Sequence, residues 1–307
     1  MTTTANPKIK PALPVLGPEK NFLGIEDPAL YDYTKARFVI QQVPYEHTSS
    51  YMRGSAEGPE AILEASHYVE FYDELLDSEP YLNGGICALA PINFENKIDN
   101  DAINLIENHT EKLIADEKFV VSLGAEHTVT FGFVKAHAKH FNNLTVLQLD
   151  AHSDLRENYL GNPYSHASVM ARIHHLGLNI CQVGIRAQCK EESELIKSSG
   201  NIHTFYAHHI RKNPDWMSEA ISCLTENVYI TIDADGFDPS VIPSVGTPEP
   251  GGLYWEETID FLQMVFNQKN VVGFDVVEMA PRPDDLRSPY NLAKLVYRLI
   301  GFAAHKY

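Results

Sequence analysis

Short apolar runs that alternate with segments of helical periodicity restrict the fold of this chain more than any other feature. Six runs rich in Val, Ile and Leu cover residues 37–43, 118–124, 144–150, 180–186, 228–235 and 271–279. Several are apolar on both faces, as strands in a sheet covered by helices must be. The alternation predicts one α/β domain with a mainly parallel central sheet.

Amphipathic segments between these runs supply the helices that would cover the sheet. Residues 58–69 start a helix with Pro59 in the first turn, where its missing N–H costs nothing. Residues 99–116 and 292–300 repeat apolar side chains at helical spacing, so we assign these stripes to the core. The Pro-rich residues 1–20 are expected to form an irregular arm, and residues 21–307 a single domain.

The composition and the N-terminal sequence indicate the class of protein and its cellular location. Its 307 residues are 44% hydrophobic, enough to fill a sizeable core, but no apolar run approaches the roughly 18 residues of a membrane span. The N-terminus lacks the apolar segment of a signal peptide, so we expect a cytoplasmic protein without membrane partners. The widely spaced cysteines indicate reduced thiols rather than a disulfide framework: Cys87, Cys181, Cys189 and Cys223.

The acidic charge balance narrows the class of ligand. A formal net charge of −17 argues against a nucleic-acid partner, because such surfaces need basic stripes. It would favour encounter with a cationic small molecule. Most of these charges also have a simpler explanation, because an acidic surface aids solubility.

Metal-ligating side chains follow three of the predicted strands. The run 118–124 leads to His127, the run 144–150 delivers Asp150 and continues to His152 and Asp154, and the run 228–235 delivers Asp233 and Asp235. In an open parallel sheet the carboxyl ends of the strands share one edge, where sites form. Alternate residues of extended chain point the same way and lie about 6.8 Å apart, so these side chains can converge.

Charge decides what must lie between these side chains. Four carboxylates in a partly buried cleft carry about four negative charges, and leaving one uncompensated costs several kcal/mol. Two divalent cations would neutralise them. Imidazole and carboxylate ligands without cysteine favour Mn²⁺, with Co²⁺, Ni²⁺ or Fe²⁺ as alternatives and tetrahedral Zn²⁺ less suited. A single Asp after a strand more often forms a turn or caps a helix, and a single His is more often an ordinary core or surface residue. The occurrence of six such residues after three strands argues for a metal site.

Several motifs carry a family resemblance. They are LGAEHTVT, LDAHSDLR, YSHAS, TIDADGFDP, GTPEPGG and FDVVEMAP, together with the N-terminal stretch VPYEHTSSYMRGSAEGPEAI. In this order they resemble the ureohydrolases, the family of arginases and agmatinases, over roughly residues 40 to 300. The resemblance implies a three-layer α/β/α sandwich of the arginase/deacetylase type, a binuclear Mn²⁺ centre, and a homotrimer or homohexamer.

The resemblance also implies a ligand set. His127, Asp150, Asp154 and Asp233 would hold the first cation, and His152, Asp150, Asp233 and Asp235 the second, so that Asp150 and Asp233 bridge. The first motif departs from the family pattern, which often has Gly-Gly, an acidic residue and His-Ser. Here Ala125, Glu126 and Thr128 flank the histidine, and the fine geometry of this loop is expected to differ.

Residue chemistry suggests how such a centre would act. A water shared by two divalent cations is available as hydroxide near neutral pH and would attack a guanidinium carbon. Glu278 ends an apolar run and could hold the planar N–H fork of that group, unless it pairs with a structural Arg. The resemblance gives His166 the role of general acid or proton shuttle, although alone it reads as a helix N-terminal histidine. Asp154 would also orient the hydroxide.

The substrate is expected to be a cationic guanidino compound. Arginases carry Asn where this chain has Arg156, so the loop resembles that of agmatinases, which release urea and putrescine in polyamine biosynthesis. An Arg156 that faces the pocket would repel a distal ammonium and favour a guanidino acid. An Arg156 paired with Glu157 or with another acid outside the pocket would be neutral on this choice. Guanidinobutyrate, guanidinopropionate, arginine and free guanidine are alternative substrates, and a non-catalytic ureohydrolase-like subunit is the alternative to an enzyme.

Overall fold

A parallel eight-stranded sheet forms the centre of the computed structural model, which describes residues 10–305. Its strand order is β2-β1-β3-β8-β7-β4-β5-β6, and each neighbouring pair is parallel. The strands are β1 (Phe38–Val43), β2 (Ile86–Ala88), β3 (Phe119–Gly124), β4 (Leu144–Leu149), β5 (Asn179–Ile185), β6 (Ile202–Tyr206), β7 (Asn227–Asp233) and β8 (Asn270–Val277). The predicted α/β architecture is confirmed.

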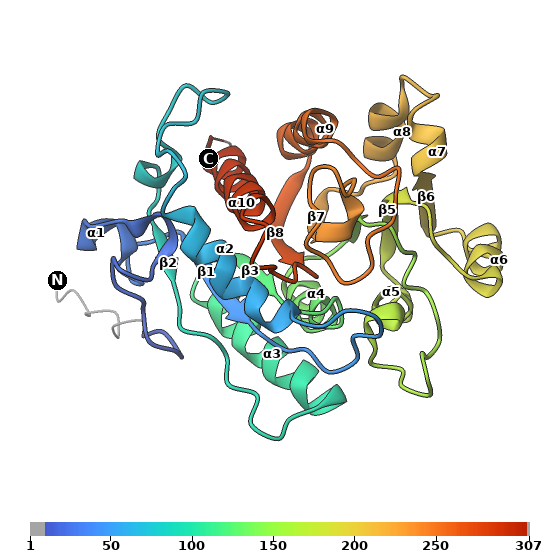
Figure 1. Cartoon of the computed structure of the whole chain (residues 1–307), viewed down its shortest axis with the longest axis horizontal. Helices are drawn as coiled ribbons and strands as arrows, with labels where there is room; N and C mark the ends of the chain where they lie inside the picture. The colour runs from blue at the N-terminus through green and yellow to red at the C-terminus, as the bar shows by residue number, and fades with distance from the viewer. Residues whose placement is uncertain (1–9, 306–307) are drawn as a thin grey trace, which may run out of the picture.

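Helices cover both faces of this sheet (Figure 1). One layer holds α3 (Asp99–Ala115), α4 (Val129–His140) and α5 (Val169–His174), and the other holds α2 (Gly58–Ser66), α8 (Trp216–Ser222), α9 (Trp255–Gln268) and α10 (Arg287–His305). The remaining helices are α1 (Pro28–Tyr31), α6 (Lys190–Ser198) and α7 (Ala207–Ile210). Alternate residues of a strand point to opposite faces of the sheet and pack against different helix layers. Leu147 therefore packs in the cluster that contains α9 and α10, and Val146 packs in the cluster that contains α4. The sheet of this three-layer sandwich therefore separates the two larger hydrophobic clusters, and a third, smaller cluster includes Val39, Cys87 and Val120.

The six predicted strands coincide with β1, β3, β4, β5, β7 and β8, within two residues at each end. Sequence reasoning missed β2 and β6, which are the two edges of the sheet. β2 has only three residues, and the residues of β6 are mostly half-exposed, so neither carries the continuous apolar pattern of a central strand.

The N-terminal arm meets the sheet at its β2 edge. Residues 1–9 of the predicted arm lie outside the described residues. Beyond them, Val15 forms an isolated antiparallel bridge with Leu89, and the Leu16 amide donates to the Ala88 carbonyl oxygen at 2.9 Å. The described end of the arm thus adds backbone hydrogen bonds to an otherwise open strand edge.

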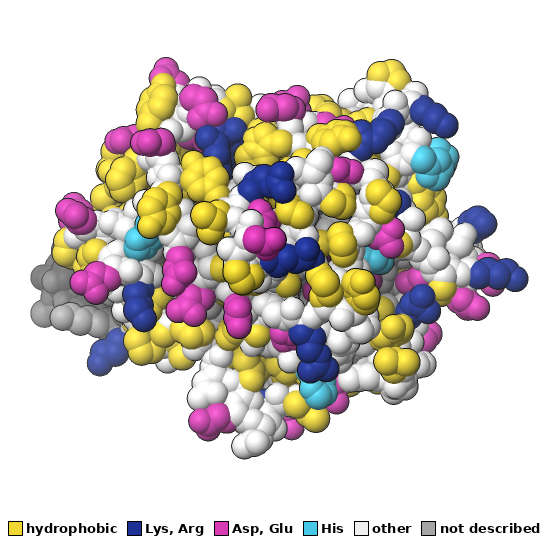
Figure 2. Space-filling view, viewed as in Figure 1, with side chains coloured by type: hydrophobic (Ala, Val, Ile, Leu, Met, Phe, Trp, Pro, Cys, Tyr) yellow, Lys and Arg dark blue, Asp and Glu magenta, His cyan; other side chains and the backbone are white. Residues whose placement is uncertain are grey.

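On the face in Figure 2, Lys and Arg side chains are interspersed among acidic and hydrophobic ones. Within residues 10–305 there is no helix of sufficient length and apolarity to cross a membrane.

Four central strands end level with one another and define the edge where the candidate residues lie. Leu149 of β4 is in register with Ile232 of β7, and Asp233 of β7 is in register with Val277 of β8. Leu123 of β3 pairs with Val276 of β8. The carboxyl ends of β3, β8, β7 and β4 therefore stand side by side.

Candidate metal centre

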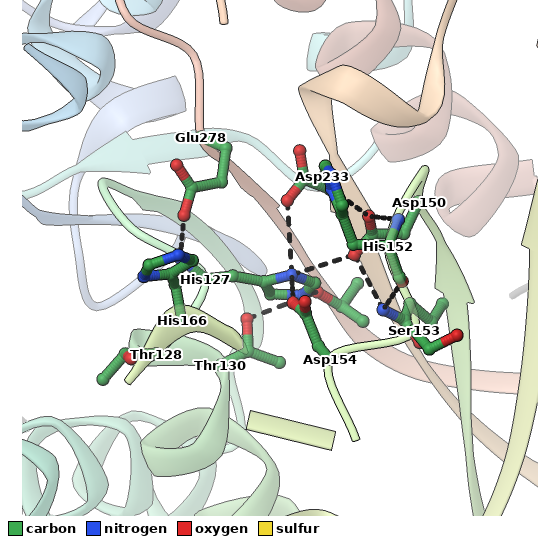
Figure 3. Close-up of polar contacts among 12 residues, drawn as sticks. His127, Thr128, Thr130, Asp150, His152, Ser153, Asp154, His166, Asp233 and Glu278 are labelled. Atoms are coloured by element: carbon green, nitrogen blue, oxygen red, sulfur yellow. Dashed lines mark hydrogen bonds and ion pairs between the residues drawn. The ribbon is translucent and has the colours of Figure 1, made fainter. Parts of the chain in front are cut away.

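Five of the six predicted ligands, all except Asp235, are labelled in Figure 3, where they converge above these strand ends, and Asp235 lies beside His152. His127 follows β3, Asp233 ends β7, and Asp235 lies in the short 3-10 helix η5 (Ala234–Gly236). The other three, Asp150, His152 and Asp154, come from the segment after β4. All are buried except His152, which is partly exposed.

The imidazole of His127 is surrounded by carboxylates. Its Nδ1 lies 3.1 Å from Asp150 Oδ2, 3.0 Å from Asp154 Oδ2 and 3.3 Å from Asp233 Oδ2. On the other side of the ring, Nε2 lies 2.9 Å from the Thr231 hydroxyl. Because that hydroxyl donates to Asp275 Oδ1 at 2.7 Å, its oxygen accepts the proton of Nε2.

The hydrogen-bond pattern leaves the lone pair of His127 Nδ1 pointing at three acidic oxygens. This nitrogen is fully buried and has no hydrogen-bond partner among the described residues. A lone pair that faces carboxylates is repulsive unless a proton or a cation lies between them. The donor set therefore fits a cation bound by His127, Asp150 and Asp233, with Asp154 in reach.

A second donor group shares Asp150 with the first. His152 Nδ1 lies 3.1 Å from Asp235 Oδ2 and 3.7 Å from Asp150 Oδ1. These three side chains offer ligand atoms within 4.8 Å of one another. Two adjacent cations with Asp150 between them fit this geometry.

Burial and mutual repulsion favour positive charge at the centre. Burial raises the pKa of Asp233 well above its ordinary value, and the charges of Asp235 and Asp150 raise it further. Burial also raises the pKa of Asp154 to about 7, again with a contribution from Asp150. Without cations, the cluster would therefore hold protons at neutral pH.

Short-range backbone hydrogen bonds orient the ligand carboxylates. The His152 amide donates to Asp150 Oδ1 at 2.6 Å, and the Asp235 amide donates to Asp233 Oδ1 at 2.9 Å. The Ala151 amide donates to Asp235 Oδ1 at 3.2 Å and so links the two loops. Each bond occupies part of a carboxylate and leaves the remaining lone pairs for a cation.

Glycine is required where the loops cross. A Cβ atom at Gly236 would lie 2.8 Å from the Asp150 amide nitrogen and 3.0 Å from its Cα atom. Such contacts are too short for any side chain, so only glycine lets the segment after β7 lie directly against the end of β4.

A row of hydrogen-bonded side chains, which includes two buried glutamine amides, ends on the Asp150 carboxylate. The Thr204 hydroxyl donates to Gln182 Oε1 at 2.8 Å, Gln182 Nε2 donates to Gln148 Oε1 at 2.6 Å, and Gln148 Nε2 donates to Asp150 Oδ2 at 2.7 Å. The row crosses β6, β5 and β4. It fixes the orientation of each amide and ends on the shared carboxylate.

Glu278 and His166 lie in the pocket beside this cluster, a cavity of about 340 Å³. Glu278 Oε1 accepts a hydrogen bond from the His127 amide at 2.6 Å, and no Lys or Arg of the described chain pairs with Glu278. The structural salt bridge considered for it is thus not what the described residues show. Glu278 and Asp154 both adopt left-handed backbone, with φ values of 64° and 53°.

Burial sets the protonation of both pocket residues. Burial lowers the pKa of His166 to about 4, and the neighbouring His152 and His127 act in the same direction. Burial raises the pKa of Glu278 well above its ordinary value, and Glu126 adds to this increase. A bound cationic group beside Glu278 would oppose that shift and favour its ionised form.

Arg156 lies on the wall of the same pocket. Its guanidinium carbon is 5.7 Å from the centre of the Tyr159 ring. Glu157, the partner considered for it, is instead bonded to Arg172 at 2.6 Å and to His175 at 3.0 Å. Arg156 is therefore not neutralised by Glu157.

The unusual residues around His127 face the loop after β1. The Glu126 carboxylate accepts from the backbone amides of His47 at 2.9 Å and Thr48 at 2.6 Å. Ala125 is fully buried, and its carbonyl oxygen accepts from the Glu278 amide at 2.7 Å. This segment thus joins Glu278 to the end of β3.

Comparison with known proteins identifies the family to which this chain is related. A family model described as the arginase family matches residues 36–301. The chain belongs to the arginase family. This arginase-family chain is 42% identical over 289 residues to the N(1)-aminopropylagmatine ureohydrolase of Synechocystis sp., with 92% of the chain and 94% of that relative covered. The predicted resemblance is confirmed.

Further relatives agree with the assignment to the arginase family. The agmatinase of Bacillus cereus is 35% identical over 278 residues, which cover 87% of this chain and 92% of the relative. The crystal structure of the agmatine ureohydrolase of Thermoplasma volcanium matches with a TM-score of 0.80 and 30% identity, covering 89% of this chain and 92% of that one. The chain is accordingly a ureohydrolase-type enzyme, a hydrolase that acts on carbon–nitrogen bonds.

Sequence reasoning missed the residues that support this arginase-family centre. Gln148 and Thr231 lie two positions before Asp150 and Asp233, so extending the period-two pattern back into each strand would have found them. Asp275 is a lone carboxylate inside an apolar run, which is a weaker signal. Thr48 carries no local signal, because its contacts are made across the fold.

Proposed function

We propose that this enzyme uses two Mn²⁺ ions to hydrolyse the guanidino group of an agmatine-type amine and release urea. The observation that carries the proposal is the buried His127 Nδ1, which faces three carboxylates next to the Glu278 pocket. Co²⁺ or Ni²⁺ would fit the same donors. His127, Asp150, Asp154 and Asp233 would hold one cation, and His152, Asp150, Asp233 and Asp235 the other.

The cations would supply a nucleophile. If these residues hold two divalent ions, the chemistry supplied would be a water of lowered pKa, available as hydroxide near neutral pH. Asp154 lies beside His127 with one carboxylate edge toward the cluster and would orient that water by accepting its hydrogen bond. Asp154 adopts left-handed backbone, with a φ of 53°.

Glu278 would hold the guanidinium. A carboxylate matches the planar N–H fork of this group in a bidentate pair, which orients its carbon atom. The buried environment that raises the pKa of Glu278 favours a cationic partner. Binding and ionisation of Glu278 are therefore coupled.

His166 would move the proton that the leaving amine requires. With its pKa lowered to about 4, the imidazole is neutral at pH 7 and can accept a proton released during attack. Transfer of that proton to the departing nitrogen completes cleavage of the carbon–nitrogen bond. His166 lines the same pocket as Glu278, which supports this assignment.

The named relatives and the charges that line the pocket help to predict how long the substrate amine is. Agmatine carries one distal ammonium, and N(1)-aminopropylagmatine, the substrate named for the Synechocystis relative, extends that end with a further amine. Glu249 lines the pocket, and within residues 10–305 its carboxylate has neither a hydrogen bond nor an ion pair. Its backbone is fixed, because Arg186 Nη2 donates to the Glu249 carbonyl oxygen at 2.9 Å and to that of Asp235 at 2.6 Å. Glu249 would attract the distal cation, so N(1)-aminopropylagmatine is the second candidate substrate.

A substrate panel tests the proposal. Urea release by the Mn²⁺-loaded enzyme would be compared as kcat/KM for agmatine, N(1)-aminopropylagmatine, guanidinobutyrate, guanidinopropionate, arginine and guanidine. We expect the two amines to exceed the acids. Urea at background from every compound, with two metal ions per chain shown by mass spectrometry, would rule the function out; fewer than one ion would instead favour a non-catalytic subunit.

The family resemblance supports a proposal for the assembly, and the cytoplasmic location is proposed separately from it. We expect a homotrimer or homohexamer in the cytoplasm, and sedimentation of the purified chain would establish its size. The net charge of −17 gives no support to a nucleic-acid partner.

A further inference from the structure

Thr48 connects His166 to the segment that carries the first histidine ligand. It lies in the loop after β1, far from both in sequence. Its hydroxyl oxygen is 3.0 Å from His166 Nδ1 and 3.2 Å from Glu126 Oε2, and it accepts from the His166 backbone amide at 3.1 Å. The Thr48 amide also donates to Glu126 Oε2, at 2.6 Å.

The direction of these bonds depends on where the single hydroxyl hydrogen of Thr48 lies. The Thr48 hydroxyl has one hydrogen and can serve either Glu126 or His166. Glu126 Oε2 accepts from the backbone amides of His47 and Thr48, and it remains an acceptor for the hydroxyl even if a proton resides on Oε1. With the hydroxyl hydrogen directed at Glu126, the Thr48 oxygen accepts the N–H of His166 Nδ1.

The consequence is a defined tautomer of His166. Neutral imidazole carries one proton, so a proton on Nδ1 leaves the lone pair on Nε2. Thr48 holds the Nδ1 edge and the backbone of His166 together. The opposite edge of the ring is the part available to the pocket that His166 lines.

We infer that Thr48 is a positioning residue, which fixes neutral His166 as its Nδ1–H tautomer and leaves Nε2 to exchange the reaction proton. This assignment rests on the proposed function of His166. Glu126 orients the Thr48 hydroxyl, and Thr48 touches none of the reacting atoms in this scheme. The loop after β1 thereby takes part in proton transfer.

Thr48→Val tests the hydroxyl, because valine keeps the branched shape and removes the hydrogen bonds. We expect kcat on the preferred guanidino substrate to fall by about 10-fold or more, with KM within about 2-fold, since general acid–base steps contribute at least that much. Thr48→Ser restores the hydroxyl and should recover kcat to within about 3-fold of the wild type. Thr34→Val, which removes a surface hydroxyl bonded to Asp32, is the matched control and should leave kcat unchanged.

Nitrogen NMR tests the tautomer without any turnover. Uniformly ¹⁵N-histidine-labelled full-length chain would be examined at pH 7, and His166→Asn would identify the His166 signals. We expect a protonated Nδ1 and an unprotonated Nε2 in the wild type and in Thr48→Ser. A mixture of tautomers is expected in Thr48→Val.

The outcomes separate this inference from the proposed function. An Nε2–H tautomer in the wild type overturns the inference, whatever the activity. Equal kcat losses in Thr48→Ser and Thr48→Val also overturn it, because loop packing rather than the hydroxyl would then matter. Absence of urea from every guanidino compound would reject the proposed function, while the NMR result would still decide the tautomer.

Discussion

His127 Nε2 and the Thr231 hydroxyl lie 2.9 Å apart, so the first histidine of the cluster is held from behind by a residue of the strand that supplies Asp233. Asp275 completes this support by accepting from the Thr231 hydroxyl at 2.7 Å. The bond fixes the proton on Nε2 and presents Nδ1 to a cation. In the proposed centre, the histidine would therefore be oriented before a metal binds.

Thr231→Val should weaken binding of Mn²⁺ by about 10-fold or more, because loss of such a supporting bond leaves the ring free to reorient. Isothermal titration calorimetry of the metal-free chain would measure the affinity. Thr145→Val is the matched control, since Thr145 is a buried strand threonine that bonds to Thr225 instead. Equal affinities in Thr231→Val and the wild type would contradict the role of this bond.

Asp150→Ala and His166→Ala should separate metal binding from proton transfer. Asp150 belongs to both donor groups, so its removal should lose both ions and all activity. His166→Ala should keep about two ions per chain and lose mainly kcat, because His166 is in neither group. Metal content by mass spectrometry and steady-state kinetics would be measured on the same preparations. Full metal content in Asp150→Ala would show that the assignment of the shared ligand is wrong.

Arg156→Gln should shift selectivity toward cationic amines. Arg156 lies on the pocket wall with its charge unpaired by Glu157, so it should repel a distal ammonium and attract a carboxylate. We expect kcat/KM for agmatine to rise by about 3-fold or more and that for guanidinobutyrate to fall, a change of roughly 1 kcal/mol for a partly screened charge. The ratio of the two constants is the measurement. An unchanged ratio would mean that Arg156 does not contact the substrate end.

Glu249→Gln should raise KM for N(1)-aminopropylagmatine more than for agmatine. The longer amine brings more positive charge to the distal end, where Glu249 lines the pocket and has Arg186 as a neighbouring charge. An increase of about 5-fold would match a partly exposed charge pair. Glu256→Gln, which removes a charge from the first turn of α9, controls for the change in net charge. Similar KM changes for both substrates would argue against distal recognition by Glu249.

Metal-free protein should lose stability as pH rises from about 4 to about 7. In the folded chain Asp154 has its pKa raised to about 7, so it keeps a proton that the unfolded chain releases near its ordinary value of 3.8. The folded state therefore binds more protons in this window, and its free energy of unfolding falls as pH increases. Bound Mn²⁺ replaces the protons and should remove most of this trend. Thermal unfolding with chelator and with Mn²⁺ would test this; a chelated form that gains stability over the window would contradict it.

The sequence predicted the parts of this structure that depend on local pattern. The central strands could be predicted because buried parallel strands are apolar on both faces. The proximity of Asp150 to His152 could be predicted because residues at period two share one face of extended chain. The edges β2 and β6 lacked that pattern. The contacts of Thr48 and Asp275 join segments distant in sequence, and the left-handed backbone at Asp154 and Glu278 follows from the surrounding fold, so none of these could be read locally.

The close approach of Gly236 to the backbone of Asp150 places the segment after β7 directly against the end of β4. The distance between the two halves of the donor set is therefore determined by main-chain contact rather than by side-chain choice. Attempts to change metal preference by widening or narrowing the centre would have to move two strands of the central sheet. Metal preference could instead be changed by exchanging the chemical type of a donor, for example by replacing the imidazole at position 127 or 152 with a carboxylate. Such a change would leave the backbone contact between the two segments intact.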